Sequence, residues 1–332
     1  MTVNVGLIGA GGIANAHMNG YLAIPEAARV TAVADVVAEN AQKRAEQAGG
    51  AKVFSDYREM LASADIDAVD ICLPHHLHAD AIVAAAAAGK HILCEKPLCL
   101  TIEEADRVQT AIKDSGVTLM CSHNQLFMPP VARARALLDE GVIGDTYELR
   151  TTDSFFSHLD PENMGWRAHR ETSGGGELID TGYHPTYLLL HLAGSTPVEV
   201  FSMLSTHRLT HSEGEDSAQV LVRFADGKVG TIITSWAYEP AACTERFSIV
   251  GEQGSLWSDG SALHVKKRGE DDTATELPQV QTIPAAVAAF VDCVREGTRP
   301  INTEAEGIDV LKVILAAYKS AEERRVVALS EL

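Results

Sequence analysis

The chain has 332 residues, 46% of them hydrophobic, and a formal net charge of −19. This length favours two domains, and the charge argues against nucleic acid and against an anionic membrane surface as partners. No apolar run approaches the roughly 20 residues that cross a bilayer. Without signal-peptide features at its start, the chain is expected to be cytoplasmic. Its scattered cysteines (72, 94, 99, 121, 243 and 293) are expected to be reduced and mostly buried.

The first predicted strand, residues 3–8, runs directly into a glycine-rich turn, Gly9-Ala10-Gly11-Gly12-Ile13-Ala14. Gly-x-Gly-x-x-Ala between a strand and a helix is typical of a dinucleotide site. Gly9 permits the tight turn, Gly11 lets a pyrophosphate approach the backbone, and Ala14 lets the helix pack on the strand. The N–H groups at the start of the helix then face the phosphates. A chance glycine-rich turn is the alternative, so the motif needs support. The residues expected to contact the cofactor here are Gly9, Gly11, Gly12, Ile13 and Ala14.

The second predicted strand supplies that support. Residues 29–35 read RVTAVAD and end on an acid, Asp35, about 21 residues beyond Ala14. An acid at this place accepts hydrogen bonds from the adenosine ribose and repels a 2′-phosphate. Val36 and Val37 follow, with no basic residue that would bind such a phosphate. We therefore predict NAD rather than NADP as the cofactor.

Strand and helix patterns alternate through residues 1–121, which we predict to form an NAD(P)-binding Rossmann domain. Strands are expected at 3–8, 29–34, 51–54, 68–73, 91–94 and 117–121, and helices at 12–24, 37–48, 57–62, 76–88 and 101–115. This alternation is typical of a doubly wound parallel sheet.

The pattern changes in residues 122–332, the predicted substrate-binding and oligomerisation domain. A helix is expected at 129–140, a strand at 145–152, a loop-rich stretch at 155–176 and a helix at 178–193. Five strand-length runs follow between Val198 and Lys267, namely VEVFSMLST, SAQVLVRF, VGTIITSWAY, RFSIVG and ALHVKK, with Asp226-Gly227 as a hairpin turn. Helices at 283–297 and 304–323 close the chain. The fold class is thus α/β: a Rossmann domain plus a C-terminal α+β domain with a large, mostly antiparallel open sheet.

The loop after the fourth strand, LPHHLH, contains His75, His76 and His78. Zinc binds imidazole readily, so a metal site is one reading. The other is a cofactor-side loop, because open parallel sheets bind ligands at the carboxyl ends of their strands. No nearby motif supplies further ligands at a metal-site spacing, and we predict no metal.

Glu95-Lys96-Pro97 follows the next strand, so Lys96 lies at its carboxyl end, beside the expected nicotinamide position. There a lysine can hold a substrate oxygen and stabilise developing alkoxide charge. A solvated surface lysine is the alternative. Pro97 is a candidate for a cis peptide bond that fixes the turn.

A third motif, SGGGELIDTGYH, spans residues 173–184. Asp180 and His184 are four residues apart, so on one helical turn they would share a face. An acid beside an imidazole can set its tautomer and make it a general base. An ordinary helix start with a satisfied histidine is the alternative. Pro185 does not suit a helix interior, so the shared face requires a late helix start or a kink.

In this order, GLIGAGGIANAH, LPHHLHAD, AGKHILCEKPL, GGGELIDTGYH and LAAYKSAEE resemble the Gfo/Idh/MocA family (glucose–fructose oxidoreductase, inositol dehydrogenase, rhizopine catabolism) over essentially the whole chain. The resemblance implies oxidation of a secondary hydroxyl of a sugar or cyclic polyol, or the reverse reduction. It also implies a sheet face that forms the oligomer interface, in a homodimer or homotetramer. Lys96, Asp180 and His184 match the family's catalytic residues. The matching positions that would line the cofactor are Pro74, His75, His78 and Glu95.

The sequence departs from the family pattern at three positions. Asparagine is usual at His75, arginine is common at Leu126, and an acid often stands at Tyr187. None of these belongs to the catalytic trio, so the departures leave the substrate open rather than the chemistry.

We therefore expect an NAD-dependent dehydrogenase in which His184 takes the hydroxyl proton, Lys96 stabilises the oxygen and Asp180 orients the histidine. Two other classes remain open: a glycosidase that uses transient oxidation and elimination, and a redox-sensing protein without turnover. Further residues expected to contact substrate are Asn124 and, in the loop 155–170, His158, Trp166 and Arg167.

Overall fold

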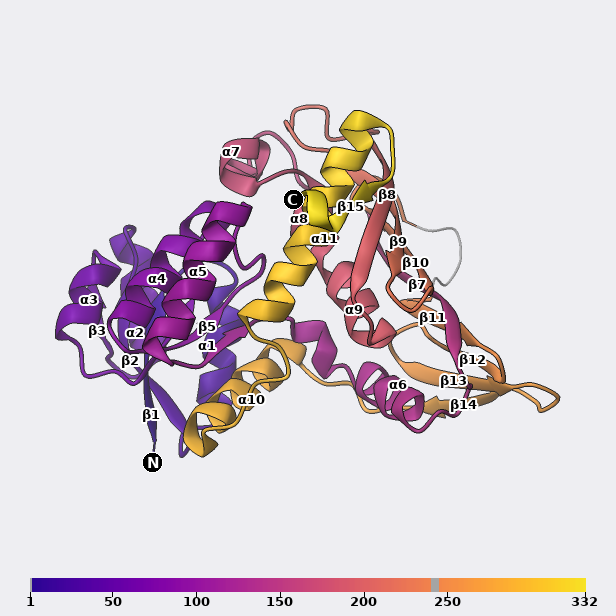
Figure 1. The fold of residues 1–332 in the computed structure, drawn as a ribbon. Helices are drawn as coiled ribbons and strands as arrows, with labels where there is room; N and C mark the ends of the chain where they lie inside the picture. The colour runs from indigo at the N-terminus through magenta and orange to yellow at the C-terminus, as the bar shows by residue number, and fades with distance from the viewer. Residues whose placement is uncertain (1, 240–244) are drawn as a thin grey trace. The chain divides into compact units, whose positions relative to one another are not determined.

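The computed structural model describes residues 2–239 and 245–332, and Cys243 lies outside them. The chain forms two compact units (Figure 1). The first contains Met1–Asn124 and Gln281–Ile308, and the second contains Gln125–Val280 and Asp309–Leu332. The expected division into 1–121 and 122–332 did not include this return of the chain to the first unit. Among the described residues, no helix is both long and apolar enough to cross a membrane.

The first unit is built on a six-stranded sheet of order β3-β2-β1-β4-β5-β6. Its strands are β1 (Val3–Ile8), β2 (Ala28–Ala34), β3 (Lys52–Phe54), β4 (Ala68–Ile71), β5 (His91–Cys94) and β6 (Leu119–Cys121). All neighbouring pairs are parallel, which confirms the predicted doubly wound sheet. The central strands are buried on both faces, because helices cover both faces of such sheets. Val5, Leu7, Val69 and Ile92 are accordingly 0% exposed.

The helices of this unit are α1 (Ala14–Ala23), α2 (Ala38–Gln47), α3 (Tyr57–Ser63), α4 (His78–Ala87), α5 (Ile102–Ser115) and α10 (Thr282–Glu296). The segment that returns to this unit carries α10, which packs closely on α1. A Cβ atom added to Gly20 of α1 would lie 2.8 Å from Cβ of Val287 on α10. A side chain at position 20 would therefore push the two helices apart.

The second unit contains a nine-stranded sheet of order β14-β13-β12-β11-β7-β10-β9-β8-β15. Its strands are β7 (Thr146–Ser154), β8 (Pro197–Ser205), β9 (Ser217–Phe224), β10 (Val229–Ser235), β11 (Phe247–Gly251), β12 (Gly254–Ser258), β13 (Ala262–Lys267), β14 (Thr273–Glu276) and β15 (Val327–Ala328). Among the described strands of this sheet only β7 and β10 pair in parallel, so the mostly antiparallel sheet is confirmed.

Three strands were not predicted, namely β12, β14 and β15. The strand β14 is exposed throughout and its only apolar residue is Ala274, so it lacks the apolar alternation that marks a half-buried strand. The strand β15 has two residues, too few for any period to be visible. Their pairing partners, rather than their own sequences, determine that they are strands.

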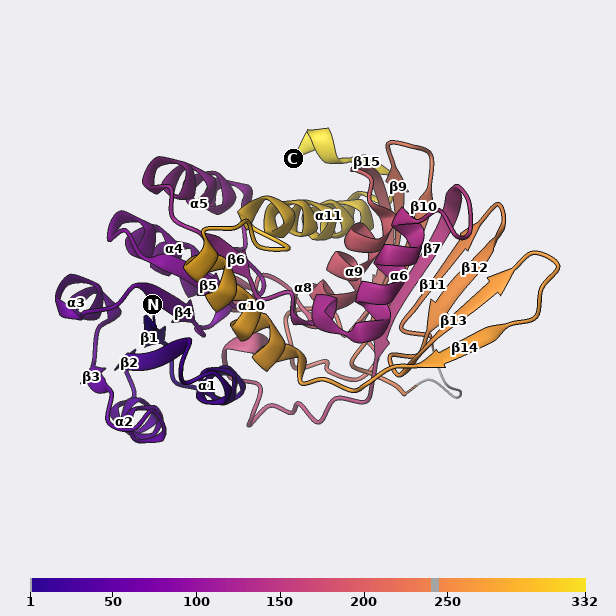
Figure 2. The ribbon, with the colours of Figure 1, turned by 90° about the horizontal axis from the view of Figure 1, so that it is seen from below.

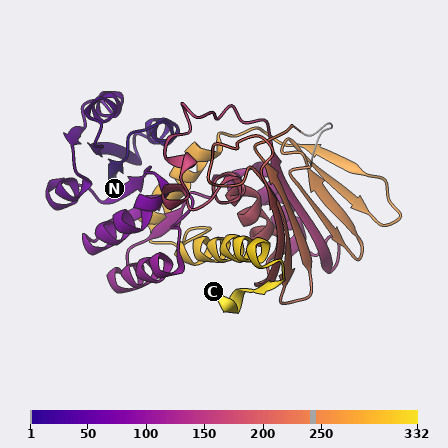
Figure 3. The same cartoon turned by 90° about the horizontal axis from the view of Figure 1, so that it is seen from above.

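The helices α6 (Pro129–Asp139) and α9 (Tyr183–Ala193) lie on one side of this sheet (Figures 2 and 3). The unit also contains α7 (Arg170–Ser173), α8 (Glu177–Asp180) and part of α11 (Glu304–Glu323). This part of α11 packs on β8, where Ser202 donates a hydrogen bond to the carbonyl of Ala317. In β9, buried and exposed residues alternate strictly from Ala218 to Phe224, as expected for a sheet with one covered face.

The predicted helix 178–193 is two helices, because α8 ends at Asp180 and α9 begins at Tyr183. Pro185 is the third residue of α9, in the first turn, where its missing N–H leaves no hydrogen bond unmade. Gly182 lies in the break, and a Cβ there would approach the Leu178 carbonyl oxygen at 2.7 Å. The late helix start is thus confirmed, whereas a shared face of Asp180 and His184 on one continuous helix is wrong.

Candidate active site

The glycine-rich turn between β1 and α1 has the backbone that a dinucleotide requires. Gly9 has a φ of 89°, and a Cβ there would overlap the carbonyl of Cys72. A Cβ at Gly11 or Gly12 would meet nothing within 4 Å, so the loop has open space beside it. The helix α1 begins without a side-chain cap, and Ala14, its first residue, is buried. The uncapped N–H groups and this space fit the phosphates of a dinucleotide.

Asp35 lies directly after β2 and its carboxylate is fixed by two backbone N–H groups. Oδ2 accepts a hydrogen bond from the N–H of Ala10 at 2.6 Å, and Oδ1 accepts one from the N–H of Val37 at 2.7 Å. The acid is therefore held against the glycine-rich turn. This position suits an acceptor for the ribose hydroxyls of the cofactor.

In the loop after β4, the ring nitrogens of His78 contact backbone carbonyls. His75 is buried, and both ring nitrogens of His78 face backbone carbonyls: Nδ1 lies 2.6 Å from the Pro97 oxygen and Nε2 2.8 Å from the Leu73 oxygen. Burial lowers the pKa of His78, and the two carbonyl contacts oppose this shift without cancelling it. His78 thereby connects the loop at residue 73 to the turn at residue 97. Its contact with the cofactor, like those of Pro74 and His75, stays a prediction.

The Lys96–Pro97 peptide bond is cis, as expected. Lys96 is partly exposed, whereas Glu95 is buried. Oε1 of Glu95 lies 2.9 Å from Nε2 of His17, and Oε2 accepts a hydrogen bond from the backbone N–H of Lys96 at 3.2 Å. No sequence motif assigns a role to His17. One feature of the sequence could have indicated this role. Asp70 interrupts the apolar strand β4, and a buried acid needs a buried partner such as His17.

Asn124 is the last residue of the first segment of the Rossmann unit. Its amide nitrogen donates a hydrogen bond to the Thr282 hydroxyl at 2.7 Å, next to the start of α10. This bond ties the end of the Rossmann segment to the returning chain. Its expected contact with substrate remains a prediction.

In the second unit, Asp180 is almost completely buried at the end of α8. Its Oδ2 accepts a hydrogen bond from Nε of Arg167 at 2.6 Å, and the Arg167 guanidinium lies 4.3 Å from the centre of the Trp166 ring. Thr181, the next residue, accepts a hydrogen bond from the indole of Trp236 at 2.8 Å. The structure therefore brings together two residues that were predicted separately, Arg167 of the substrate loop and Asp180 of the catalytic trio.

His184 lies in the first turn of α9 and contacts Tyr187 one turn later. The distance between its Nδ1 and the Tyr187 hydroxyl oxygen is 2.8 Å. The same oxygen accepts a hydrogen bond from the backbone N–H of Gln125 at 3.0 Å. Tyr187 stands where the family often has an acid, so a phenol occupies a place from which a carboxylate would contact the histidine. Of the other loop residues, His158 is exposed and stacks edge to face on Phe156.

Two family descriptions match most of the chain. Residues 3–123 match the "Oxidoreductase family, NAD-binding Rossmann fold", and residues 131–257 match the "GFO/IDH/MocA C-terminal domain".

Named relatives align with at least three quarters of the chain. The chain is 34% identical to the levoglucosan dehydrogenase of Pseudarthrobacter phenanthrenivorans over 76% of this chain and 73% of that protein. It is 26% identical to the myo-inositol 2-dehydrogenase of Thermotoga maritima over 99% of both proteins. A D-xylose 1-dehydrogenase from Haloarcula marismortui, named for NADP, is 27% identical over 89% of this chain and 82% of that protein.

A solved levoglucosan dehydrogenase in complex with NADH and levoglucosan superposes on the structure with a TM-score of 0.90. It has 28% sequence identity and covers 99% of this chain and 100% of its own. The glycine-rich turn, the fixed Asp35 carboxylate and these matches agree with one another. The chain belongs to the Gfo/Idh/MocA family of NAD-binding oxidoreductases.

Proposed function

We propose that the protein is an NAD-dependent dehydrogenase that oxidises a secondary hydroxyl of a sugar, sugar derivative or cyclic polyol, or performs the reverse reduction. The observation that carries the proposal is the combination of a dinucleotide turn with Lys96, Asp180 and His184 in one chain. The named dehydrogenases of levoglucosan and myo-inositol among its relatives support this substrate class. NAD, when bound, accepts the hydride.

The roles of the three side chains follow from their chemistry and contacts. The Lys96 ammonium stabilises the oxygen as it gains negative charge. His184 takes the hydroxyl proton on Nε2, which requires that Nδ1 carries a proton and donates it in a hydrogen bond to Tyr187. Asp180 supplies negative charge that favours the imidazolium, and its hydrogen bond from Arg167 fixes the carboxylate. Trp166 and Arg167 are proposed to contact the substrate from the loop.

The test is NADH formation, followed by absorbance, on a panel of substrates. The panel contains levoglucosan, inositols, aldoses, sugar acids and glycosides, with NAD and NADP run in parallel. We expect oxidation of a sugar or polyol with NAD preferred, because Asp35 repels a 2′-phosphate. Glycoside cleavage without net NADH would instead favour the transient-oxidation glycosidase. Cofactor binding without turnover of any substrate would favour a sensor.

Variants test the residue roles. Lys96→Ala and His184→Ala are each expected to lower kcat/KM by about 100-fold or more. Lys90→Ala is the matched control, because Lys90 lies in the same unit and donates to the carbonyl of Ile66. Near wild-type turnover by a folded Lys96→Ala or His184→Ala variant would contradict the mechanism.

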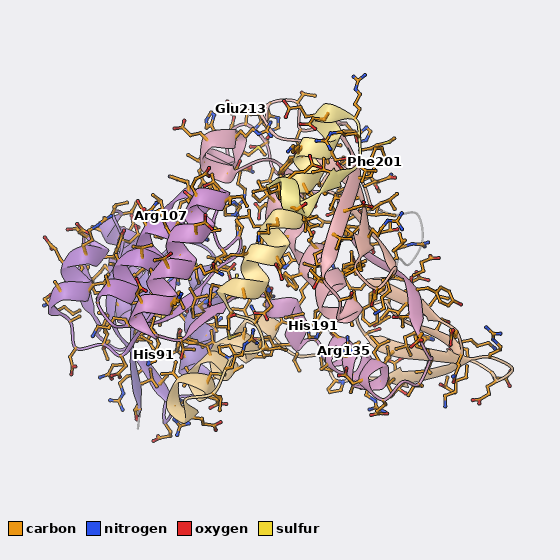
Figure 4. All side chains as sticks on the ribbon, in the orientation of Figure 1. His91, Arg107, Arg135, His191, Phe201 and Glu213 are labelled. Atoms are coloured by element: carbon orange, nitrogen blue, oxygen red, sulfur yellow. The ribbon has the colours of Figure 1, made fainter. Side chains whose placement is uncertain are left out.

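We further propose that the protein is a homodimer or homotetramer that associates through the sheet of the second unit. Met203 of β8 is 68% exposed and Leu221 of β9 is 46% exposed. Leu221 pairs with Phe201 of β8, which is labelled in Figure 4. Neighbouring exposed apolar side chains of this kind favour a covered surface. Light scattering is expected to show an oligomer that Met203→Lys with Leu221→Lys dissociates. A monomeric wild-type protein would refute this association.

A further inference from the structure

A buried hydrogen-bond network connects α1, β4 and β5 beneath the turn that carries Lys96. His17 and Tyr21 come from α1, Asp70 from β4, and Glu95 follows β5. Nδ1 of His17 lies 2.8 Å from Oδ2 of Asp70, and Nε2 lies 2.9 Å from Oε1 of Glu95. The Tyr21 hydroxyl donates to the same Oδ2 of Asp70 at 2.9 Å. His17 and Asp70 are 0% exposed, so water does not replace these contacts.

The contacts determine the charge of His17. Ionised carboxylates only accept hydrogen bonds, and a neutral imidazole has only one N–H to donate. Each ring nitrogen faces a carboxylate oxygen, so with both carboxylates ionised both nitrogens donate and the ring is an imidazolium. Burial alone would lower the pKa of His17, but the Asp70 charge raises it well above its usual range. Burial likewise raises the pKa of Glu95, but the hydrogen bond and charge of His17 lower it to about 2.

The other titratable groups around the ring do not neutralise it. Burial and the Asp70 charge raise the pKa of the Cys72 thiol to about 12, so the thiol stays protonated. It donates to Oδ1 of Asp70 at 3.6 Å. The Tyr21 phenol also stays protonated, because burial raises its pKa well above its usual range. One imidazolium therefore stands between two carboxylates, and its charge lowers the pKa of Glu95.

Glu95 transmits this arrangement to the turn. One carboxylate oxygen contacts His17 and the other accepts the backbone N–H of Lys96 at 3.2 Å. A rotation of the Glu95 side chain would break both contacts at once. We propose that His17 is a positioning residue that fixes Glu95 between itself and the Lys96 backbone and thereby sets the position of the Lys96 side chain. This inference rests on the proposed function, in which Lys96 acts on the substrate oxygen.

A metal ion is the competing reading of the same cluster, because atoms of His17, Asp70 and Cys72 lie within 4.8 Å of one another. Nδ1 and Oδ2 are already at hydrogen-bond distance, however, and the thiol is protonated. A hydrogen-bonded ion network accounts for the geometry without a metal.

The experiment compares His17→Gln with Tyr21→Phe. Gln at position 17 removes the positive charge, whereas Phe at position 21 removes one hydrogen bond to Asp70 and leaves the His17–Glu95 contact intact. The first readout needs neither substrate nor cofactor. The rate of Lys96 acylation by acetic anhydride is measured by mass spectrometry, with Lys90 of the same protein as the internal reference. We expect the Lys96 to Lys90 ratio to change severalfold in His17→Gln and to stay within twofold in Tyr21→Phe.

The second readout is the pH profile of kcat/KM with the sugar or polyol found in the panel. Displacement of Lys96 is expected to lower kcat about tenfold in His17→Gln. Because Glu95 loses the charge that keeps it ionised, this variant also gains an acid limb in weakly acidic solution that the wild type and Tyr21→Phe lack. Double replacement with Glu95→Gln removes the uncompensated carboxylate and is expected to abolish that limb.

The acylation and activity measurements test the positioning role of His17 and the proposed function separately. Unchanged Lys96 acylation in a folded His17→Gln protein overturns the positioning role even if the enzyme is active. A wild-type protein inactive on the whole panel refutes the function, while the acylation ratio still tests the positioning. If His17→Gln does not fold, Glu95→Gln takes its place with the same expected change in acylation. Stoichiometric zinc in purified protein that is lost in His17→Gln would also overturn the inference.

Discussion

The two units bury ionisable side chains in opposite ways. In the first, the imidazolium of His17 lies between the carboxylates of Asp70 and Glu95, and burial is offset by opposite charge. In the second, Glu177 at the start of α8 is 0% exposed, and the nearest charges that act on it are other carboxylates, led by Glu215. Burial raises the pKa of Glu177 well above its usual range, so a bound proton replaces the counter-ion.

The hydrogen bonds of the Thr234 hydroxyl also indicate that Glu177 is protonated. The Thr234 hydroxyl is within hydrogen-bond distance of both the Asp153 carbonyl and Oε1 of Glu177. The hydroxyl has one proton and a carbonyl only accepts, so both bonds form only if Glu177 donates. A buried acid beside a cation thus stays ionised and fixes geometry, whereas the buried Glu177, which has carboxylates for neighbours, holds its proton. The first kind of site suits the positioning of a charged lysine.

The largest expected effect is the loss of the central cation. His17→Ala leaves Asp70 and Glu95 as buried carboxylates without their partner, and we expect the free energy of unfolding to fall by about 3–5 kcal/mol. Tyr21→Phe removes one hydrogen bond from the same network and is expected to cost about 1 kcal/mol. Denaturant unfolding measures both values. Equal losses in the two variants would show that the charge of His17 is not what stabilises the network.

The acid sensitivity of the first unit is the next test. The pKa of Glu95 lies at about 2 in the folded protein against 4.5 unfolded, so its contribution is complete above pH 4.5 and is lost as the pH falls toward 2. This contribution is on the order of 3 kcal/mol. Glu95→Gln should make the free energy of unfolding depend less on pH in this range. A slope equal to that of the wild type would contradict the assignment.

Much of this arrangement could be predicted from the sequence, and the limits have physical causes. The glycine-rich turn, Asp35 and the cis Lys96–Pro97 bond depend on local backbone chemistry, which short motifs record. The His17 network joins side chains 53 and 78 residues apart, so no local pattern contains it. The break at Gly182 was visible in Pro185, but its position depends on the close approach of Leu178.

The two histidines offer a third comparison, because His17 has two carboxylate partners and His184 has a phenol. Tyr187→Phe removes the oxygen that faces Nδ1 of His184. If that oxygen accepts from Nδ1–H, the imidazolium loses an acceptor, and kcat/KM should fall several-fold with its acid limb moved to lower pH. If Tyr187→Phe were less active but the acid limb of its pH profile did not move, Tyr187 would contribute packing rather than a hydrogen bond to His184.

The smallest effect, and the one of opposite sign, is expected at Glu177. A carboxyl group whose pKa is raised by folding contributes fully below its unfolded pKa, near 4.5, and loses that contribution as the pH rises. Gln keeps the size of the side chain and can still donate to Thr234. Glu177→Gln should therefore match the wild type in acid and be more stable than the wild type at neutral pH. Glu162→Gln, at an exposed site, controls for the change of charge alone. If Glu177→Gln were instead destabilised at neutral pH, Glu177 would be an ionised acceptor, and the contrast between the two units would fail.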